Sequence, residues 1–263
     1  MITASRLRKI FNRGAATELT AIAGIDLAVA AGEFVAVIGG NGAGKSTLLN
    51  LLAGAYACDE GTIAIDGADV TRTPEHARAA WVARIFQDPM LGTAAALTVE
   101  ENLTLALMRA QGRGLKPALT TARRTRFREA LSGLRLGLEE RLGVVVSTLS
   151  GGQRQALALA MATLTPPKLL LLDEHTAALD PRTSELVMEA TVGIVAKAKL
   201  TTLMVTHNME HALRYASRIV MMDAGRIVAD LGSTEKAGLG VSDLIERFRI
   251  RDDRIVLRQA GGA

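Results

Sequence analysis

Short apolar runs alternate with helical patterns over much of this 263-residue chain. Residues 34–38 are apolar and mostly β-branched, residues 169–172 are four leucines, and residues 201–206 form a third run. Runs of this length predict buried strands of a parallel sheet. Residues 46–52 directly follow the first run and predict a helix. Alternation of strands and helices is typical of an α/β protein.

The middle of the chain follows a different pattern. Thr98 is an N-cap candidate with Glu101 three residues later, and leucines at 103, 105 and 107 continue the predicted helix. We therefore expect a single domain in which a helical subdomain interrupts the core. Its parts are a core of residues 1–87 and 166–231, a helical subdomain of residues 88–165 with a linker at 111–114, and a helical tail of residues 232–263.

A glycine-rich segment lies between the first predicted strand and its helix and matches G-x-x-x-x-G-K-[ST]. It consists of Gly39, Gly40, Asn41, Gly42, Ala43, Gly44, Lys45, Ser46 and Thr47. Successive backbone N–H groups at a helix N-terminus bind phosphate, the lysine reaches the β- and γ-phosphates, and the Ser46 hydroxyl ligates Mg²⁺. Such a loop can match by chance, but the flanking strand and helix favour phosphate binding.

Two acids, Asp173 and Glu174, end the leucine run. Open α/β sheets bind ligands at the carboxyl ends of their strands. Asp173 is therefore expected to hold Mg²⁺, directly or through water. Glu174 is expected to orient or deprotonate the water that attacks the γ-phosphate. The alternative is a solvated strand end, which Lys45 and Ser46 make the poorer interpretation.

A third motif, LSGGQ, occupies residues 149–153, with Ser150 as a candidate N-cap. The three motifs in this order resemble the nucleotide-binding subunit of an ABC transporter, and the resemblance extends from Phe11 to about Asp230. It implies an α/β fold of the P-loop NTPase class, ABC type, with a mixed-sheet core and an inserted helical subdomain. It also implies ATP and Mg²⁺ as cofactors.

The resemblance further implies a homodimer packed head to tail. Ser150, Gly151, Gly152 and Gln153 then meet the nucleotide that the other subunit binds. Backbone N–H groups and the positive end of a helix dipole suit a γ-phosphate. ATP would therefore join two chains, and its hydrolysis would release them.

Four further residues gain a role only through the resemblance. Gln87 corresponds to a glutamine that contacts Mg²⁺ or its water and senses the membrane partner. His207 corresponds to a histidine that bonds the γ-phosphate, and Asp180 to an aspartate at the dimer seam. Phe11 stands where the family places an aromatic residue that stacks on adenine, the alternative being a core residue.

One residue departs from the family pattern. His175 follows the expected catalytic glutamate, where the family usually has proline. Its imidazole either packs in the core, the better interpretation, or senses pH. Residues 86–93 together with His175 resemble a subgroup associated with bacterial uptake of small solutes such as amino acids.

Composition limits the setting in which the chain works. The formal charge is +4, but aromatic residues make up only 3% and do not interleave with the basic ones, so we expect no nucleic-acid partner. We interpret the basic excess as solvated helix faces near an anionic membrane. No apolar run approaches the ~18 residues of a membrane span. No secretion signal is apparent, and the one cysteine, Cys58, excludes an internal disulfide.

Two functions remain open at this stage. In the first, a homodimer drives a separate integral-membrane permease, as an importer with a substrate-binding protein, from the cytoplasmic face of the membrane. In the second, the chain is a soluble ABC ATPase of an iron–sulfur assembly system. In the first, Met90 and Leu91 are expected to contact the permease, whereas Trp81 and Phe86 are more readily explained as core residues.

Overall fold

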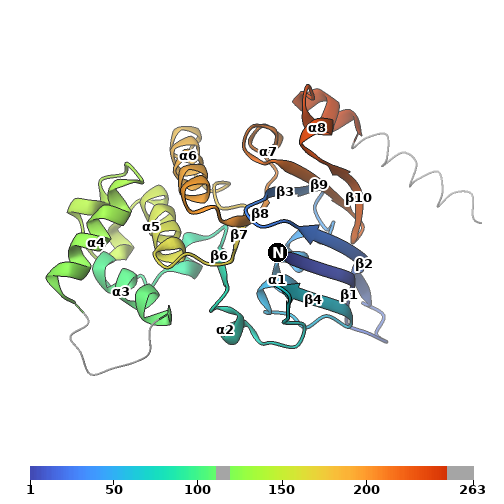
Figure 1. The fold of residues 1–263 in the computed structure, drawn as a ribbon, viewed down its shortest axis with the longest axis horizontal. Helices are drawn as coiled ribbons and strands as arrows, with labels where there is room; N and C mark the ends of the chain where they lie inside the picture. Colours follow the sequence, from blue (N-terminus) through green and yellow to red (C-terminus); the bar gives the residue numbers. More distant parts are fainter. Residues whose placement is uncertain (111–118, 248–263) are drawn as a thin grey trace, which may run out of the picture.

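The computed structural model describes residues 1–110 and 119–247, and the predicted linker at 111–114 lies outside the described residues. Two sheets lie on either side of helix α1 (Lys45–Ala53), and a block of helices packs at the far end of the molecule (Figure 1). The strands are β1 (Ile2–Phe11), β2 (Leu19–Val29), β3 (Phe34–Gly39), β4 (Glu60–Ile65), β5 (Ala68–Asp69), β6 (Val82–Ile85), β7 (Leu169–Asp173), β8 (Thr201–Val205), β9 (Arg218–Asp223) and β10 (Arg226–Leu231).

The larger sheet has the strand order β10-β9-β3-β8-β7-β6. All neighbours are parallel except β10, which pairs with β9 in the antiparallel sense. The carboxyl ends of β3, β6, β7 and β8 therefore lie along one edge. The smaller sheet, β2-β1-β4-β5, is antiparallel. The chain thus combines a parallel core with an antiparallel sheet.

Side chains of the core sheet alternate between two hydrophobic clusters. On β3, Val35 and Val37 join α1 and the antiparallel sheet, whereas Ala36 and Ile38 join the helices of the opposite face. Both faces are buried, which explains why the strands are continuous apolar runs in the sequence. Trp81 lies at the margin of the first cluster.

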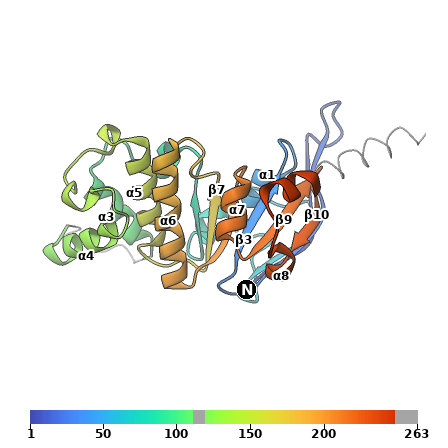
Figure 2. The same ribbon diagram turned by 90° about the horizontal axis from the view of Figure 1, so that it is seen from above.

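Of the remaining helices, the first lies beside the end of α1, and the others cover the second face and extend beyond it (Figures 1 and 2). They are α2 (Glu75–Arg78), α3 (Val99–Ala110), α4 (Thr121–Ser132), α5 (Gly151–Thr163), α6 (Pro181–Ala198), α7 (Met209–Tyr215) and α8 (Ser233–Lys236), with 3₁₀ turns η1 (Pro89–Gly92), η2 (Leu138–Glu140) and η3 (Val146–Thr148). Residues 241–247 are also helical.

Helix α3 begins as the sequence predicts. The backbone N–H and the hydroxyl of Thr98 both donate to Glu101 Oε2 at 2.7 Å, and the Glu101 N–H returns a bond to the Thr98 hydroxyl. Buried side chains of α3, α4 and α5 belong to the same hydrophobic cluster as β6 and β7. The helical block is therefore packed continuously against the core sheet.

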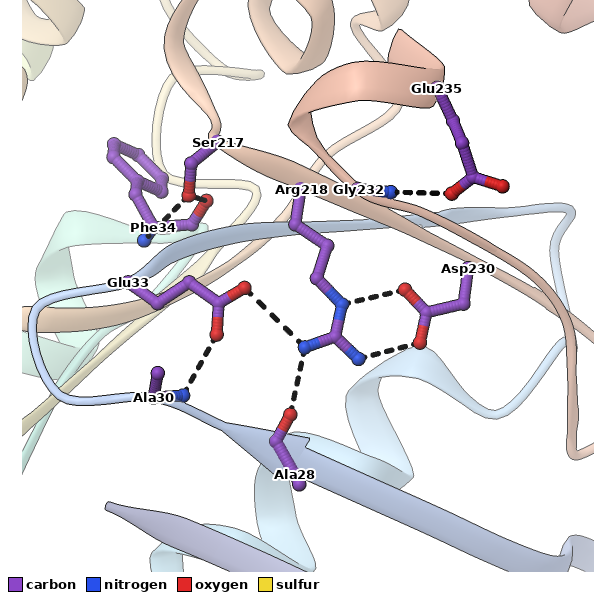
Figure 3. A network of polar contacts seen from close by, with 9 residues as sticks. All are labelled: Ala28, Ala30, Glu33, Phe34, Ser217, Arg218, Asp230, Gly232 and Glu235. Atoms are coloured by element: carbon purple, nitrogen blue, oxygen red, sulfur yellow. Dashed lines mark hydrogen bonds and ion pairs between the residues drawn. The ribbon is translucent and has the colours of Figure 1, made fainter.

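An arginine on β9 links the two sheets (Figure 3). Arg218 donates two hydrogen bonds to Asp230 on β10, at 2.6 and 2.5 Å, and one to the carbonyl of Ala28 on β2 at 2.8 Å. Glu33 lies 3.4 Å from the same guanidinium. The bond to Asp230 and the nearby carboxylates raise the Arg218 pKa.

Within the described ranges, no helix is long and apolar enough to cross a membrane.

Candidate nucleotide-binding site

A cleft of about 270 Å³ opens at the carboxyl edge of the core sheet, beside the loop between β3 and α1. It brings together segments that are far apart in the sequence. Its walls are formed by Phe11, Leu19, Ala21, Asn41, Gly42, Ala43, Gly44, Lys45, Ser46, Thr47, Glu174 and His207. Most of the residues predicted to hold a nucleotide within one chain therefore share one cleft.

Glycine is required at several positions of the loop. Gly42 and Gly44 have φ of 79° and 96°, in the left-handed region that favours glycine. A Cβ at Gly44 would lie 2.5 Å from the carbonyl oxygen of Ala21, and one at Gly39 would lie 2.4 Å from that of Met222. The loop is thus folded tightly against β2 and β9. Alternating right- and left-handed residues form a concave array of N–H groups that suits an anion.

Lys45 is the first residue of α1 and is 6% exposed. Its Nζ donates to the carbonyl oxygens of Gly39 and Gly40, both at 2.9 Å. Burial lowers its pKa, and the carboxylates of Glu174 and Asp173 oppose that shift. The ammonium is therefore held against the start of the loop, within electrostatic reach of the two acids.

The opposite end of α1 is held by a residue that sequence reasoning missed. Arg78 is 1% exposed, and it donates to the carbonyl oxygens of Leu51 and Leu52 at 2.6 and 3.0 Å. Positive charge at a helix C-terminus complements the helix dipole. Burial lowers the Arg78 pKa. Arg78 thus stabilises the helix on which the phosphate loop depends.

Glu174 follows β7 directly and has a φ of 46°, an uncommon conformation for a residue with a side chain. Its N–H donates to Val205 at the end of β8, at 3.0 Å. Oε1 lies 2.7 Å from Nε2 of His207, two residues past the end of β8. The turn at Glu174 therefore directs its carboxylate along the sheet edge, toward His207 and into the cleft.

Asp173 is the last residue of β7 and does not line the cleft. Its Oδ2 pairs with Arg84 of β6 at 2.5 Å, and both side chains are largely buried. Neither Arg84 nor its other partner, Asn50 of α1, was predicted from the sequence. The sequence did carry one signal for this ion pair, because an arginine inside an apolar strand needs a polar partner.

Two oxygen donors of the kind that Mg²⁺ prefers lie near the carboxyl edge of the core sheet: the exposed Ser46 hydroxyl in the first turn of α1 and the Asp173 carboxylate at the end of β7. Mg²⁺ is usually bound by one or two carboxylates together with substrate phosphates, so this donor set fits the ion.

Gln87 follows β6 and is exposed, and it does not line the cleft. Its strand is separated from β3 by β7 and β8, so its proposed metal contact stays a prediction. Over residues 1–110 and 119–247, no group of three or more His, Cys, Asp or Glu could hold a metal ion.

Phe11, at the end of β1, lines the cleft as the adenine-stacking hypothesis requires. Its ring makes an edge-to-face contact with Tyr56, with centroids 5.4 Å apart. Lys9 Nζ lies 5.6 Å from the centroid of the same ring. Tyr56 was not predicted, because its position in a loop after α1 carries no pattern. Phe11 is thus the aromatic residue that lines the cleft, and Tyr56 supports its ring.

The LSGGQ segment does not line this cleft. Ser150 caps α5: its hydroxyl accepts from the Gln153 N–H at 3.3 Å, and Gln153 Oε1 accepts from the Ser150 N–H at 3.2 Å. Ser150 and Gly151 are exposed, whereas Gly152 is buried so close to Thr183 of α6 that a Cβ would overlap it. Asp180 caps α6 through a 3.1 Å bond from the Thr183 N–H.

His175 is packed, as the better of the two sequence interpretations has it. Its side chain is 2% exposed, and Nε2 lies 3.3 Å from the Thr191 hydroxyl of α6. Burial, assisted by the nearby His211 of α7, lowers its pKa to about 3. The imidazole is therefore neutral near pH 7.

A phosphate loop between a parallel strand and a helix, with two acids at the end of a nearby strand and a histidine just past the end of the strand between them, defines a P-loop nucleotide hydrolase. The sequence match is more specific. Residues 22–177 fit the family described as ABC transporter. The chain belongs to the ABC transporter family and is an ATPase whose cofactors are ATP and Mg²⁺.

Two curated relatives extend this result. The chain is 44% identical over 248 residues to a tyrosine transport ATP-binding protein of Clostridioides difficile, a match that covers 94% of this chain and 98% of the relative. It is 37% identical over 252 residues to a methionine import ATP-binding protein of Caulobacter vibrioides, covering 94% and 72%. The relatives are transport subunits, so the iron–sulfur assembly alternative has no support.

Solved structures agree with the fold. A dimeric structure of the ABC transporter cassette MJ0796 superposes with a TM-score of 0.77 at 29% identity, covering 89% of this chain and 99% of that one. The same cassette in a dimeric post-hydrolysis state bound to ADP and Pi also gives 0.77, at 27% identity. The predicted fold class, an α/β P-loop NTPase of ABC type, is confirmed.

Proposed function

We propose that this chain is the ATP-hydrolysing subunit of an importer for a small solute, an amino acid. It would act as a homodimer bound to an integral-membrane permease on the cytoplasmic face, together with a substrate-binding protein. The relationship to a tyrosine transport subunit over nearly the full length of both chains supports this solute class. The observation that carries the proposal is the cleft, in which a phosphate loop faces Glu174 and His207.

The residues of the cleft have separable roles in this proposal. N–H groups of the loop and Lys45 hold the phosphates, while Ser46 and Asp173 offer oxygens to the metal. When bound, Mg²⁺ neutralises charge that develops on the β- and γ-phosphate oxygens. Glu174 accepts a proton from the attacking water, and His207, 2.7 Å away, fixes the orientation of that carboxylate. Phe11 stacks on the adenine ring.

The start of α5 supplies the other half of the proposed site. Ser150 and Gly151 are exposed at a helix N-terminus, and they contribute nothing to the cleft of their own chain. Two copies packed head to tail would bring each such helix start to the γ-phosphate held by its partner. Both solved structures of the cassette MJ0796 are dimeric, which supports this arrangement.

The surface that meets the permease is proposed at η1. Met90 and Leu91 are 40% and 69% exposed, and they follow Gln87 closely. Arg154 of α5 donates to the Met90 sulfur at 2.7 Å, so η1 is joined to the helix that begins with the LSGGQ segment. A change at the nucleotide would reach the permease along this path.

Co-purification and uptake test the proposal. The full chain should co-purify with a membrane protein, and the reconstituted complex should take up labelled tyrosine or methionine only with ATP. Met90→Asp/Leu91→Asp should bind ATP normally yet fail to assemble or to drive uptake. Val241→Asp, at a residue 39% exposed, is the matched control and should behave as wild type. Normal uptake by the double variant would locate the coupling surface elsewhere, and uptake of neither amino acid would reject the solute class.

A further inference from the structure

The carboxylate of Asp173 is held by an arginine on the neighbouring strand. Arg84 Nη2 donates to Asp173 Oδ2 at 2.5 Å, and Nη1 donates to the Asn50 side-chain oxygen of α1 at 2.6 Å. The two side chains of the ion pair are only 12% and 13% exposed. Within the described part of the chain, no hydrogen bond reaches the other oxygen, Oδ1.

Strand register accounts for this contact. Arg84 on β6 pairs with Leu171 on β7, and Asp173 lies two residues further along the same strand. Residues two apart share a face of a strand, so Arg84 and Asp173 project to the same side of the sheet. That side carries α1, the helix that begins at Lys45 and contains Asn50. The guanidinium therefore lies between the strand of the two acids and the helix of the phosphate loop.

The guanidinium also contacts the segment that leads to Gln87. Its carbon lies 4.7 Å from the centroid of the Phe86 ring. A planar guanidinium bonds two acceptors at fixed angles and stacks on a ring, which a lysine ammonium does not reproduce. Arg84 thus joins three parts of the proposed metal site: β7, α1 and the turn after β6.

We propose that Arg84 is the positioning residue of the metal site: it fixes Oδ2 of Asp173 and thereby presents Oδ1 to Mg²⁺. This inference rests on the proposed role of Asp173 as a metal ligand. A residue that holds a metal ligand by hydrogen bonds orients that ligand, and its loss usually reduces metal affinity by about 10–100-fold. A partner that acted only through its charge would have the opposite effect, because a nearby positive charge repels the metal.

Replacement by lysine separates geometry from charge. Arg84→Lys keeps the positive charge but loses the planar guanidinium that bonds two acceptors. Arg84→Gln loses both the charge and the guanidinium. Mn²⁺ binding would be followed by its electron paramagnetic resonance signal at saturating non-hydrolysable ATP analogue, and analogue affinity would be measured separately in EDTA. We expect Arg84→Lys and Arg84→Gln to raise the half-saturating Mn²⁺ concentration at least about 10-fold. Analogue affinity in EDTA should stay within about twofold, which also shows that the variants fold.

Two results would overturn the inference. In the first, Arg84→Lys binds Mn²⁺ as wild type does and Arg84→Gln binds it more tightly. This result would mean that Arg84 acts only through its charge. The other is additivity, in which the double variant Arg84→Lys/Asp173→Asn binds Mn²⁺ more weakly than Asp173→Asn does. If Arg84 acts through Asp173, the second substitution should weaken Mn²⁺ binding no further. Arg218→Lys, which alters a comparable two-bond pair with Asp230, is the control and should leave Mn²⁺ binding unchanged.

Asp173→Asn alone tests the underlying assumption. Weaker Mn²⁺ binding by this variant supports the metal role of Asp173, and the Arg84 variants then decide the inference. Unchanged Mn²⁺ binding by Asp173→Asn would reject the metal role itself, and the Arg84 assignment with it.

Discussion

The cleft and the start of α5 are built in different ways. In the cleft, Phe11, the phosphate loop, Glu174 and His207 come from four separate segments. At the start of α5, the groups are consecutive, and the capping bonds join Ser150 to Gln153 only three residues away. The first region depends on packing of the whole core, whereas the capping bonds of the second lie within one helix turn. The two regions are therefore unlike in construction, and in the proposed head-to-tail dimer each would form half of a nucleotide site.

The largest expected effect lies in the cleft. Glu174→Gln should lower ATP hydrolysis by about 10²–10⁴-fold, because it removes the proposed proton acceptor while leaving the phosphate contacts intact. ATP affinity should be retained, and dimers should accumulate with ATP, as measured by phosphate release and sizing chromatography. Glu189→Gln, an exposed residue of α6, is the control and should hydrolyse ATP normally. Monomer alone with ATP, together with normal hydrolysis, would reject both the Glu174 role and the dimer.

Lys45→Ala should weaken ATP binding by about 10–100-fold, because charged hydrogen bonds contribute about 1.5–3 kcal/mol. Nucleotide titration of the folded variant measures this loss. Unchanged ATP affinity would contradict the assigned phosphate loop.

Mixing two variants sharpens the comparison between the half-sites. Gly151→Asp adds a negative charge at the start of α5, and a Cβ there meets only ordinary contact, 3.6 Å from Leu179. Neither Lys45→Ala nor Gly151→Asp should hydrolyse ATP alone. An equal mixture should recover about a quarter of the wild-type rate, since half of the two-fold dimers are mixed and each has one intact site. No recovery on mixing would mean that the two half-sites do not act across a dimer.

The response to acid should be a smaller effect. It concerns the packing of His175 behind the cleft and not the start of α5. The pKa of His175 is lowered to about 3 from its usual 6.5, so the unfolded chain binds more protons between these values. The stabilisation is complete above pH 6.5 and is lost as the pH falls toward 3. The melting temperature should fall by about 2–4 °C per pH unit below 6.5.

Thermal melts from pH 7 to pH 4 measure this response. His175→Leu should flatten the dependence, whereas His76→Gln, at an exposed histidine, should preserve it. An unchanged slope in His175→Leu would assign the acid response to other groups.

Local elements were largely predictable from the sequence. The helix predicted over 46–52 is α1, Lys45–Ala53, and the strand predicted over 169–172 is β7, Leu169–Asp173. Capping at Thr98 and Ser150 was also predictable, because an N-cap bond joins residues three apart. The strand predicted over 201–206 ends one residue earlier, at Val205.

The surroundings of the acids were not predictable. Arg84 and Asp173 are 89 residues apart, and the register of β6 against β7 brings them together. Tyr56 meets Phe11 because the loop after α1 returns to the end of β1. Single-sequence patterns specify the period of an element and leave open which elements become neighbours.

The motifs and the class of protein could be predicted from consecutive residues, because phosphate loops and helix caps are built from consecutive backbone groups. The folded structure was needed to show which groups share the cleft, how burial lowers the pKa of His175, and that Arg84 holds Asp173. The difference arises because motifs depend on residues that are close in the sequence. Burial and ion pairing depend on neighbours in space, and those neighbours are set by strand order and register across the whole sheet.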